Sequence, residues 1–286
     1  MTSALKILAT PIGNIRDITL RALDELKAAD IILAEDTRHT KALIKALNIT
    51  LKDSVRLISC DSRREEHRSA QVLRFLEQNL SVVLVSDAGT PALSDPGSLL
   101  VQAVVRGAGA LEVIPGASAL TAALMGAGVD TTRFAFLGFL PQKKQARKRL
   151  IESASCAELA LIFYESPLRV QALLNELHEL LGPRRVVVAR ELTKIYETFH
   201  RGTLGEILSP ALVSKGECVV IVEAQGSAKL INPSCEQNQE IISIINKSQE
   251  SSKDLVLTLV KKYKLKKKSA YDLVLSQRRH NWDRED

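Results

Sequence analysis

The stretch Ser86–Gly97 holds the residue types best suited to bind a small ligand in this chain. It reads Ser-Asp-Ala-Gly-Thr-Pro-Ala-Leu-Ser-Asp-Pro-Gly, after the apolar run Ser81–Val85 and before the helical pattern of Ser98–Arg106. The stretch is therefore expected at the carboxyl end of a buried strand, where open α/β sheets bind ligands. Its glycines let backbone amides approach a ligand, and Asp87 and Asp95 can accept hydrogen bonds from amines or hydroxyls. The same residues also suit an ordinary strand-to-helix loop.

Loops of small or charged residues follow other predicted strands of the first part of the chain. They are Thr10–Asn14, Glu35–Thr40 and Pro115–Ala119. Strands alternating with helices over short connections predict a doubly wound, mostly parallel sheet, with these loops gathered on one edge. The small-residue loops among them, Thr10–Asn14 and Pro115–Ala119, together with Asp87–Pro91, suit a flat, zwitterionic, nucleoside-containing ligand held by backbone groups. The strands expected here are Leu5–Ala9, Ile31–Ala34, Val55–Ser59, Ser81–Val85 and Leu111–Ile114.

A second α/β unit is predicted downstream, and a small helical region after it. Closely spaced strands around Leu192–Lys194 indicate a hairpin, so the second sheet is expected to be mixed. Residues 1–130 are expected to form the first domain, 131–225 the second, 226–239 a linker, and 240–286 a small basic helical region. The expected strands are Phe134–Phe139, Leu159–Tyr164, Arg185–Arg190, Ile195–His200 and Glu217–Val222; the expected helices are Gln145–Ser153 and Leu168–Leu181 in the second domain, with three short amphipathic ones in Glu240–Gln277.

Composition and absent motifs narrow the class of protein. The 286 residues carry a net charge of +6, with basic clusters at Lys143–Arg149 and Lys261–Lys268 that indicate a polyanion partner or, alternatively, solvated helix faces. The four cysteines lack metal or redox spacing, and neither a secretory leader nor an apolar run of membrane-spanning length is evident, so a soluble cytoplasmic protein is expected. Gly-x-Gly-x-x-Gly, Gly-Lys-Ser/Thr and Gly-x-Ser-x-Gly motifs are absent and the histidines are scattered. These absences argue against dinucleotide binding by a Rossmann motif, phosphate binding by a P-loop, serine-hydrolase catalysis and zinc catalysis. No metal is expected.

Several motifs follow one another in a specific order along the chain. They are Thr10–Asn14, Ala34–Arg38, Val85–Pro91, Pro115–Ala119, Gly138–Pro141, Phe163–Pro167 and Glu191–Glu197. In these motifs the chain, from about Leu5 to Glu223, resembles the ribosomal RNA small subunit methyltransferase I family of the tetrapyrrole methylase superfamily, which methylates a cytidine ribose 2′-hydroxyl. The tail from Glu240, with Tyr263–Lys266, resembles that family's helical end domain.

The resemblance implies S-adenosylmethionine bound in a cleft between two α/β domains, in a protein that is typically a homodimer. Two departures from the family pattern, Cys60–Arg64 and Leu168, lie near the expected RNA cleft and keep a catalytically inactive RNA-binding relative in view. A methylase of a small tetrapyrrole is the other alternative, because fold alone does not set function. The cofactor-binding residues implied are Ile12, Gly13, Asp87, Gly89, Thr90, Pro91, Ser94, Ser118, Ala119, Glu165 and Leu192.

Methyl transfer to a ribose hydroxyl requires alignment, a proton acceptor and a nearby cation. Glu35, Asp36 and Asp87 are candidates for the base, and Arg38 or Lys194 for the cation. We expect Asp36, Arg38 and Lys194 to be catalytic, although Glu35–Arg38 could equally be a local ion pair that caps the next helix. Phosphate contacts give affinity and salt sensitivity. The expected RNA-binding residues are Lys143, Arg147, Lys148, Arg169, Lys266 and Lys267.

Overall fold

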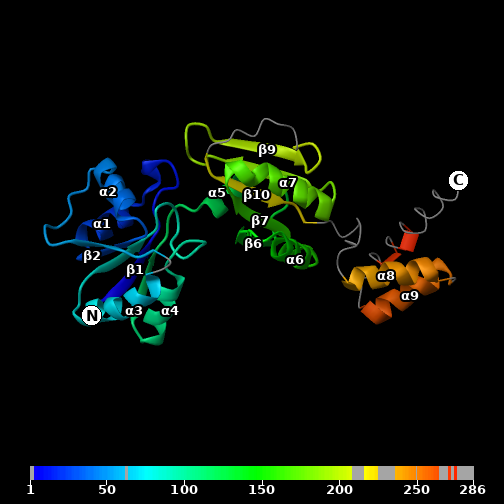
Figure 1. Cartoon of the computed structure of the whole chain (residues 1–286), viewed down its shortest axis with the longest axis horizontal. Helices are drawn as coiled ribbons and strands as arrows, with labels where there is room; N and C mark the ends of the chain where they lie inside the picture. The colour runs from blue at the N-terminus through cyan, green and yellow to red at the C-terminus, as the bar shows by residue number, and fades with distance from the viewer. Residues whose placement is uncertain are drawn as a thin grey trace. The chain divides into compact units, whose positions relative to one another are not determined.

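The computed structural model describes residues 3–61, 64–207, 216–224, 236–248, 250–263, 270–271 and 274–275 (Figure 1). Two compact units divide the chain: Met1–Gly126 with Ala189–Thr198, and Ala127–Val188 with Phe199–Asp286. The segment Ala189–Thr198, expected in the second domain, thus has its contacts with the first unit. The remaining domain limits stay predictions. Within the described ranges, none of the helices has the length and apolar character needed to cross a membrane.

The first unit is built on a parallel sheet whose strand order is β3-β2-β4-β1-β5. Adjacent residues of a strand face opposite sides, so Ile31 and Leu33 pack with one pair of helices while Ile32 and Ala34 pack with another. Helices α1 and α2 lie on one face and α3 and α4 on the other, as Figure 1 shows. The predicted doubly wound sheet is confirmed. The strands are β1 Ala4–Leu8, β2 Ile31–Ala34, β3 Arg56–Ser59, β4 Val82–Val85 and β5 Ala110–Ile114.

Two helices of this unit begin earlier than the sequence pattern predicted. Helix α2 starts at Thr37, because the Asp36 side chain accepts a hydrogen bond from the Arg38 amide and caps the first turn. Residues 37–40, expected as a loop, are therefore helical. The sequence pattern predicts a polar segment over Asp61–Arg68 and a helix over Val72–Gln78, whereas helix α3 already starts at Glu65. The helices are η1 Ile15–Asp17, α1 Leu20–Ala28, α2 Thr37–Ala46, α3 Glu65–Glu77, α4 Ser98–Arg106 and α5 Ala119–Gly126.

The second unit contains a mixed sheet of order β6-β7-β10-β8-β9, as predicted. Strand β7 pairs in parallel with β6 and antiparallel with β10. Strand β9 begins at Thr198, later than expected, because residues 191–197 form a loop in which Glu191 and Thr193 have positive φ. The elements are β6 Phe134–Phe139, α6 Lys144–Ser155, β7 Ala160–Glu165, α7 Pro167–Leu181, β8 Arg185–Arg190, β9 Thr198–Thr203 and β10 Cys218–Val222.

The C-terminal region has its own small apolar cluster. Helices α8 (Glu236–Lys247) and α9 (Ser252–Tyr263) contribute Ile241 and Leu259, and Ala270 and Val274 complete the cluster. Most of the predicted third helix, most of the predicted linker, and the predicted RNA contacts Lys266 and Lys267 lie outside the described residues.

Candidate active site

Three loops meet at the carboxyl edge of the first sheet, as the strand order requires. The Thr10 amide donates to the Gly89 carbonyl at 2.8 Å, and the Gly89 amide donates back to the Thr10 carbonyl at 3.0 Å. The Thr90 hydroxyl donates to the Ala117 carbonyl at 3.1 Å. Because β4, β1 and β5 are neighbours, the loops that follow them are brought together by these bonds. The edge expected to bind a ligand is therefore a connected backbone surface.

The loop between β4 and α4 holds its backbone in uncommon conformations. Gly89 has φ +81°, and Ala92 and Ser94, which are not glycines, have φ 66° and 67°. A left-handed conformation costs an L-residue roughly 1–2 kcal/mol. The strain is held in place by contacts such as the Ala92 amide donating to the Pro96 carbonyl at 3.1 Å. Strain of this kind is typical of ligand-binding loops.

Ser118 offers a polar atom suited to a ligand. Its hydroxyl is buried and has no hydrogen-bond partner within the described ranges. A buried hydroxyl without a partner costs free energy, so a ligand that supplies one gains from it. Ala119 follows it at the start of α5, and Ile12, buried in the first loop, lies 3.2 Å from the position that a Cβ on Gly89 would occupy.

The segment Ala189–Thr198 packs against the first loop. A Cβ on Gly13 would lie 2.5 Å from Lys194 Cγ and 2.9 Å from the Leu192 carbonyl oxygen, so only glycine fits there without displacement. The Asn14 amide donates to Thr193 Oγ1 at 3.0 Å. Tertiary packing thereby joins the segment of Leu192 and Lys194 to the first loop at Gly13 and Asn14.

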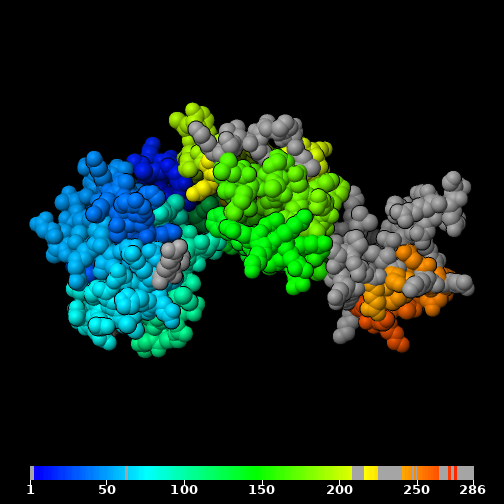
Figure 2. All heavy atoms as spheres, viewed as in Figure 1, coloured from blue at the N-terminus to red at the C-terminus, as the bar shows by residue number. Residues whose placement is uncertain are grey.

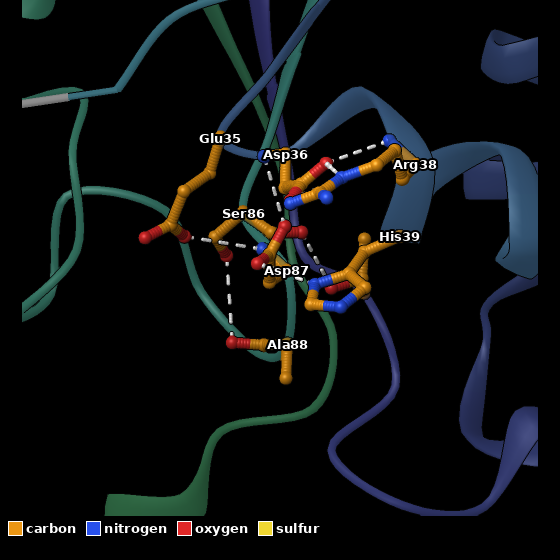
Figure 3. A network of polar contacts seen from close by, with 8 residues as sticks. Glu35, Asp36, Arg38, His39, Ser86, Asp87 and Ala88 are labelled. Carbon is orange, nitrogen blue, oxygen red and sulfur yellow. Dashed lines mark hydrogen bonds and ion pairs between the residues drawn. The ribbon is translucent and has the colours of Figure 1, made fainter.

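A charged network lies beside these loops, at the ends of β2 and β4 (Figure 3). The Asp87 carboxylate accepts from the Asp36 amide at 3.0 Å and lies 2.6 Å from His39 Nδ1. The Asp87 amide donates to Glu35 Oε2 at 3.3 Å. Strands β2 and β4 are parallel neighbours, which places the residues that follow them side by side. The network therefore combines a carboxylate, an imidazole and a second, half-buried carboxyl group.

The groups of this network differ in how readily they exchange protons. Arg38 donates to the Asp36 carboxylate from its backbone amide and its guanidinium, which holds the pKa of Asp36 far below its usual range. Burial raises the pKa of Glu35, and hydrogen bonding to Asp87 raises the pKa of His39. Asp36 and Arg38 form an ion pair at the start of α2, and Asp36 caps that helix. The sequence alone left this arrangement open as the alternative to a catalytic role. Their catalytic role stays a prediction.

His39 was missed by sequence reasoning, which treated the histidines as scattered. A signal was available, since His39 stands three positions after Asp36, one helical turn into the element after β2. Its pairing with Asp87 depends on β2 lying next to β4 rather than next to β1. This strand order cannot be read from the sequence, so the pairing could not be predicted.

The contacts that the structure describes for the predicted site residues of the second unit lie within that unit. Glu165, buried, accepts from the Ser166 amide at 2.7 Å and from Arg169 Nε at 2.8 Å. Arg147 donates to Glu176 at 2.6 Å and to two backbone carbonyls of its own unit. Lys148 lies 3.8 Å from Glu152, and Lys143 is exposed. Their cofactor and RNA contacts stay predictions. No group of three or more His, Cys, Asp and Glu side chains in the described ranges could hold a metal ion.

Residues 5–208 match the family model of the Tetrapyrrole (Corrin/Porphyrin) Methylases. Among solved structures, the methyltransferase CobJ has a TM-score of 0.60 at 20% identity, covering 81% of this chain and 98% of that one. Diphthine synthase has a TM-score of 0.61 at 15% identity, covering 83% and 95%. These structures share the fold.

Fold and family model define the class, a methylase of the tetrapyrrole methylase type, whose cofactor is S-adenosylmethionine. Two relatives named "Ribosomal RNA small subunit methyltransferase I" narrow this class to one family. The one from Halalkalibacterium halodurans is 43% identical over 224 residues, 78% of this chain and 76% of that protein. The one from Neisseria meningitidis serogroup B is 40% identical over 278 residues, 95% and 93%. The chain belongs to the ribosomal RNA small subunit methyltransferase I family.

Proposed function

We propose that this protein transfers a methyl group from S-adenosylmethionine to the ribose 2′-hydroxyl of a cytidine in small-subunit ribosomal RNA. The observation that carries the proposal is the 40% identity to a ribosomal RNA methyltransferase across 95% of the chain. The structure supports it with a connected set of strand-end loops and a charged network beside them. The substrate implies action in the cytoplasm, and the resemblance implies a homodimer.

The chain offers a fitting cradle for the cofactor. The strand-end loops carry Gly89, where an added side chain would crowd the buried Ile12, and Ser118, whose buried hydroxyl has no partner in the described part of the chain. We propose that these loops hold the nucleoside and methionine parts through backbone groups, with Asp87 accepting from an amine or hydroxyl. The full proposed set in this unit is Ile12, Gly13, Asp87, Gly89, Thr90, Pro91, Ser94, Ser118, Ala119 and Leu192; Glu165 is the member from the second unit.

Exposed groups near the cofactor loops suit a single-stranded nucleotide. The tip of residues 191–197 presents Ile195 and Tyr196, which are 90% and 72% exposed. The tip is held in shape by the Thr193 amide, which donates to Glu197 at 2.6 Å, and by the Lys194–Glu191 ion pair. A rigid exposed aromatic ring beside a cation can stack on an unpaired base.

Exposed cations on the second unit suit phosphates. Lys143, Lys144, Lys148 and Arg149 lie exposed at and after the start of α6, whose green segment forms part of the surface in Figure 2. We propose that these side chains contact the RNA backbone and give affinity that falls with salt. A small tetrapyrrole substrate would not need them, which favours the RNA over the alternative substrate.

The chemistry requires little from the protein beyond alignment and proton transfer. The bound cofactor supplies an activated sulfonium methyl group. The chain must orient the hydroxyl in line with it, exclude water and accept the hydroxyl proton. The charged network around Asp87 is the part of the first unit best equipped to do so.

The test is methyl incorporation from labelled S-adenosylmethionine into small ribosomal subunits, with free tetrapyrroles as the competing substrate. Nuclease digestion and mass spectrometry of the product then locate the methyl group. The proposal expects a 2′-O-methylcytidine. A methyl group on a base, or incorporation only into a tetrapyrrole, would contradict it, and cofactor binding without any transfer would indicate an inactive RNA-binding relative.

A further inference from the structure

We infer that His39, oriented by Asp87, accepts the proton that the ribose hydroxyl loses when it is methylated. The inference rests on the proposed function and deepens it by naming the base. It differs from the sequence-based expectation, which placed this role on Asp36, Glu35 or Asp87 itself.

The geometry of the pair carries the inference. His39 Nδ1 lies 2.6 Å from Asp87 Oδ2, while Asp87 Oδ1 accepts from the Asp36 amide at 3.0 Å. Each oxygen of the carboxylate therefore has a partner that fixes its orientation, as Figure 3 shows. A carboxylate that accepts from Nδ1–H leaves the lone pair on Nε2, the tautomer required of a general base.

The position of the imidazole leaves its other nitrogen accessible. The His39 side chain is 66% exposed, and in the described part of the chain its Nε2 makes no hydrogen bond. His39 lies in the first turn of α2, and Asp87 belongs to the same loop as Gly89 and Thr90 of the proposed cofactor cradle. His39 is therefore held against the same loop that is proposed to bind the cofactor.

The other carboxyl groups of the network are less suited to the role. Asp36 is held ionised by Arg38 and has little tendency to accept a proton. Glu35 accepts from the Asp87 amide and is half-buried. The negative charge of Asp36 raises the pKa of His39 and the positive charge of Arg38 lowers it, so these two neighbours partly offset each other.

The proposed step balances as a simple displacement. The ribose oxygen forms its bond to the methyl carbon as the methyl–sulfur bond breaks, and sulfur keeps that electron pair. The hydroxyl proton passes to His39 Nε2, and the imidazolium, stabilised by Asp87, then releases it to water. The protein returns to its starting state without a metal or a redox partner.

The pair sets the expected pH dependence. Asp87 raises the pKa of His39 above its ordinary value of 6.5, mainly through their hydrogen bond. Only the neutral imidazole accepts a proton, so the transfer rate should rise with pH through that raised pKa. Removing the Asp87 charge lowers the pKa, moves the inflection to lower pH, and reverses the tautomer preference.

The experiment combines kinetics with a measurement on the resting protein. In single-turnover assays with small ribosomal subunits, His39→Gln should lower the transfer rate by about 10²–10⁴-fold and abolish the inflection, with S-adenosylmethionine affinity within about twofold. Asp87→Asn should also slow transfer, and added imidazole should restore part of the rate of His39→Ala. The matched control is His67→Gln, a change at an exposed residue of α3, which should leave the transfer rate, the inflection and the cofactor affinity unchanged.

Nitrogen NMR of the imidazole ring gives the readout that does not depend on turnover. It should show Nδ1–H in the full-length protein, and a pKa above 6.5 that falls in Asp87→Asn. A wild-type tautomer with Nε2–H, or a His39→Gln rate within threefold of wild type with the product still on the ribose oxygen, would overturn the inference alone. A methyl group found elsewhere than on a ribose oxygen would overturn the proposed function, and the role of His39 with it.

Discussion

Replacing Gly89 by alanine tests whether the loop after β4 holds the cofactor. Gly89 has φ +81°, and the added Cβ would meet Ile12 Cγ2 at 3.2 Å and the Ala117 carbonyl oxygen at 3.8 Å. The backbone conformation costs alanine about 1–2 kcal/mol, and the contact with Ile12 adds a small overlap. The free loop can relieve this strain by shifting, and cofactor binding must then reverse the shift. We therefore expect S-adenosylmethionine to bind about 5–30-fold more weakly.

The chain supplies a matched control for this change. Gly182, after α7, has φ +70°, and a Cβ there would meet nothing within 4 Å. Gly182 combines this φ with ψ −164°, a conformation that is essentially confined to glycine, so Gly182→Ala should lose about 1–3 kcal/mol in urea unfolding without altering cofactor affinity. Isothermal titration compares the two, and a bulky Gly89→Trp should abolish binding in a folded protein. Equal cofactor affinity for wild type, Gly89→Ala and Gly182→Ala would refute the placement.

Three further predictions follow from the described contacts. Ser118→Ala should weaken cofactor binding about 2–10-fold in calorimetry. The melting temperature of the free protein should stay equal or rise, because the substitution removes a buried hydroxyl that has no partner in the described part of the chain. Unchanged affinity would show that Ser118 does not contact the cofactor. Replacing Lys143 and Lys148 by alanine should flatten the log–log salt dependence of RNA binding by about one unit per lost phosphate contact. Arg147→Ala should chiefly lower stability, because the partners of Arg147 are Glu176 and backbone carbonyls. An unchanged salt slope for the lysine variant would argue against RNA binding by α6. Asp36→Asn keeps an acceptor for the Arg38 amide, so its transfer rate should stay within tenfold of wild type; a loss of 10²-fold or more would return the base to Asp36.

Much of the first unit could be predicted from local patterns. The runs Ile31–Ala34 and Val82–Val85 are apolar at every position and too short for helices, so central parallel strands were the natural prediction. Helix starts were less accurate, because Asp36 extends α2 by a capping bond that competes with an ordinary charged loop. Strand β9 began late for a similar reason, since the unusual φ values of Glu191 and Thr193 are not visible in residue type.

The candidate site was likewise predictable in part. The sequence by itself determined which loops carry Gly89, Ser118 and Asp87, because small and acidic residues directly after apolar strands can be recognised by type and spacing. It also determined the family, through motifs spread over most of the chain. What it left open was every contact between segments distant in sequence.

Only the tertiary structure decided which charged groups meet. His39 reaches Asp87 because β2 pairs with β4, and Lys194 reaches the first loop because Gly13 has no side chain to keep the two segments apart. Strand order and close backbone approach arise from burying both faces of the sheet at once, a property of the whole fold. Local sequence encodes the propensity of each segment, while the pairing of a base with its orienting carboxylate depends on how those segments pack.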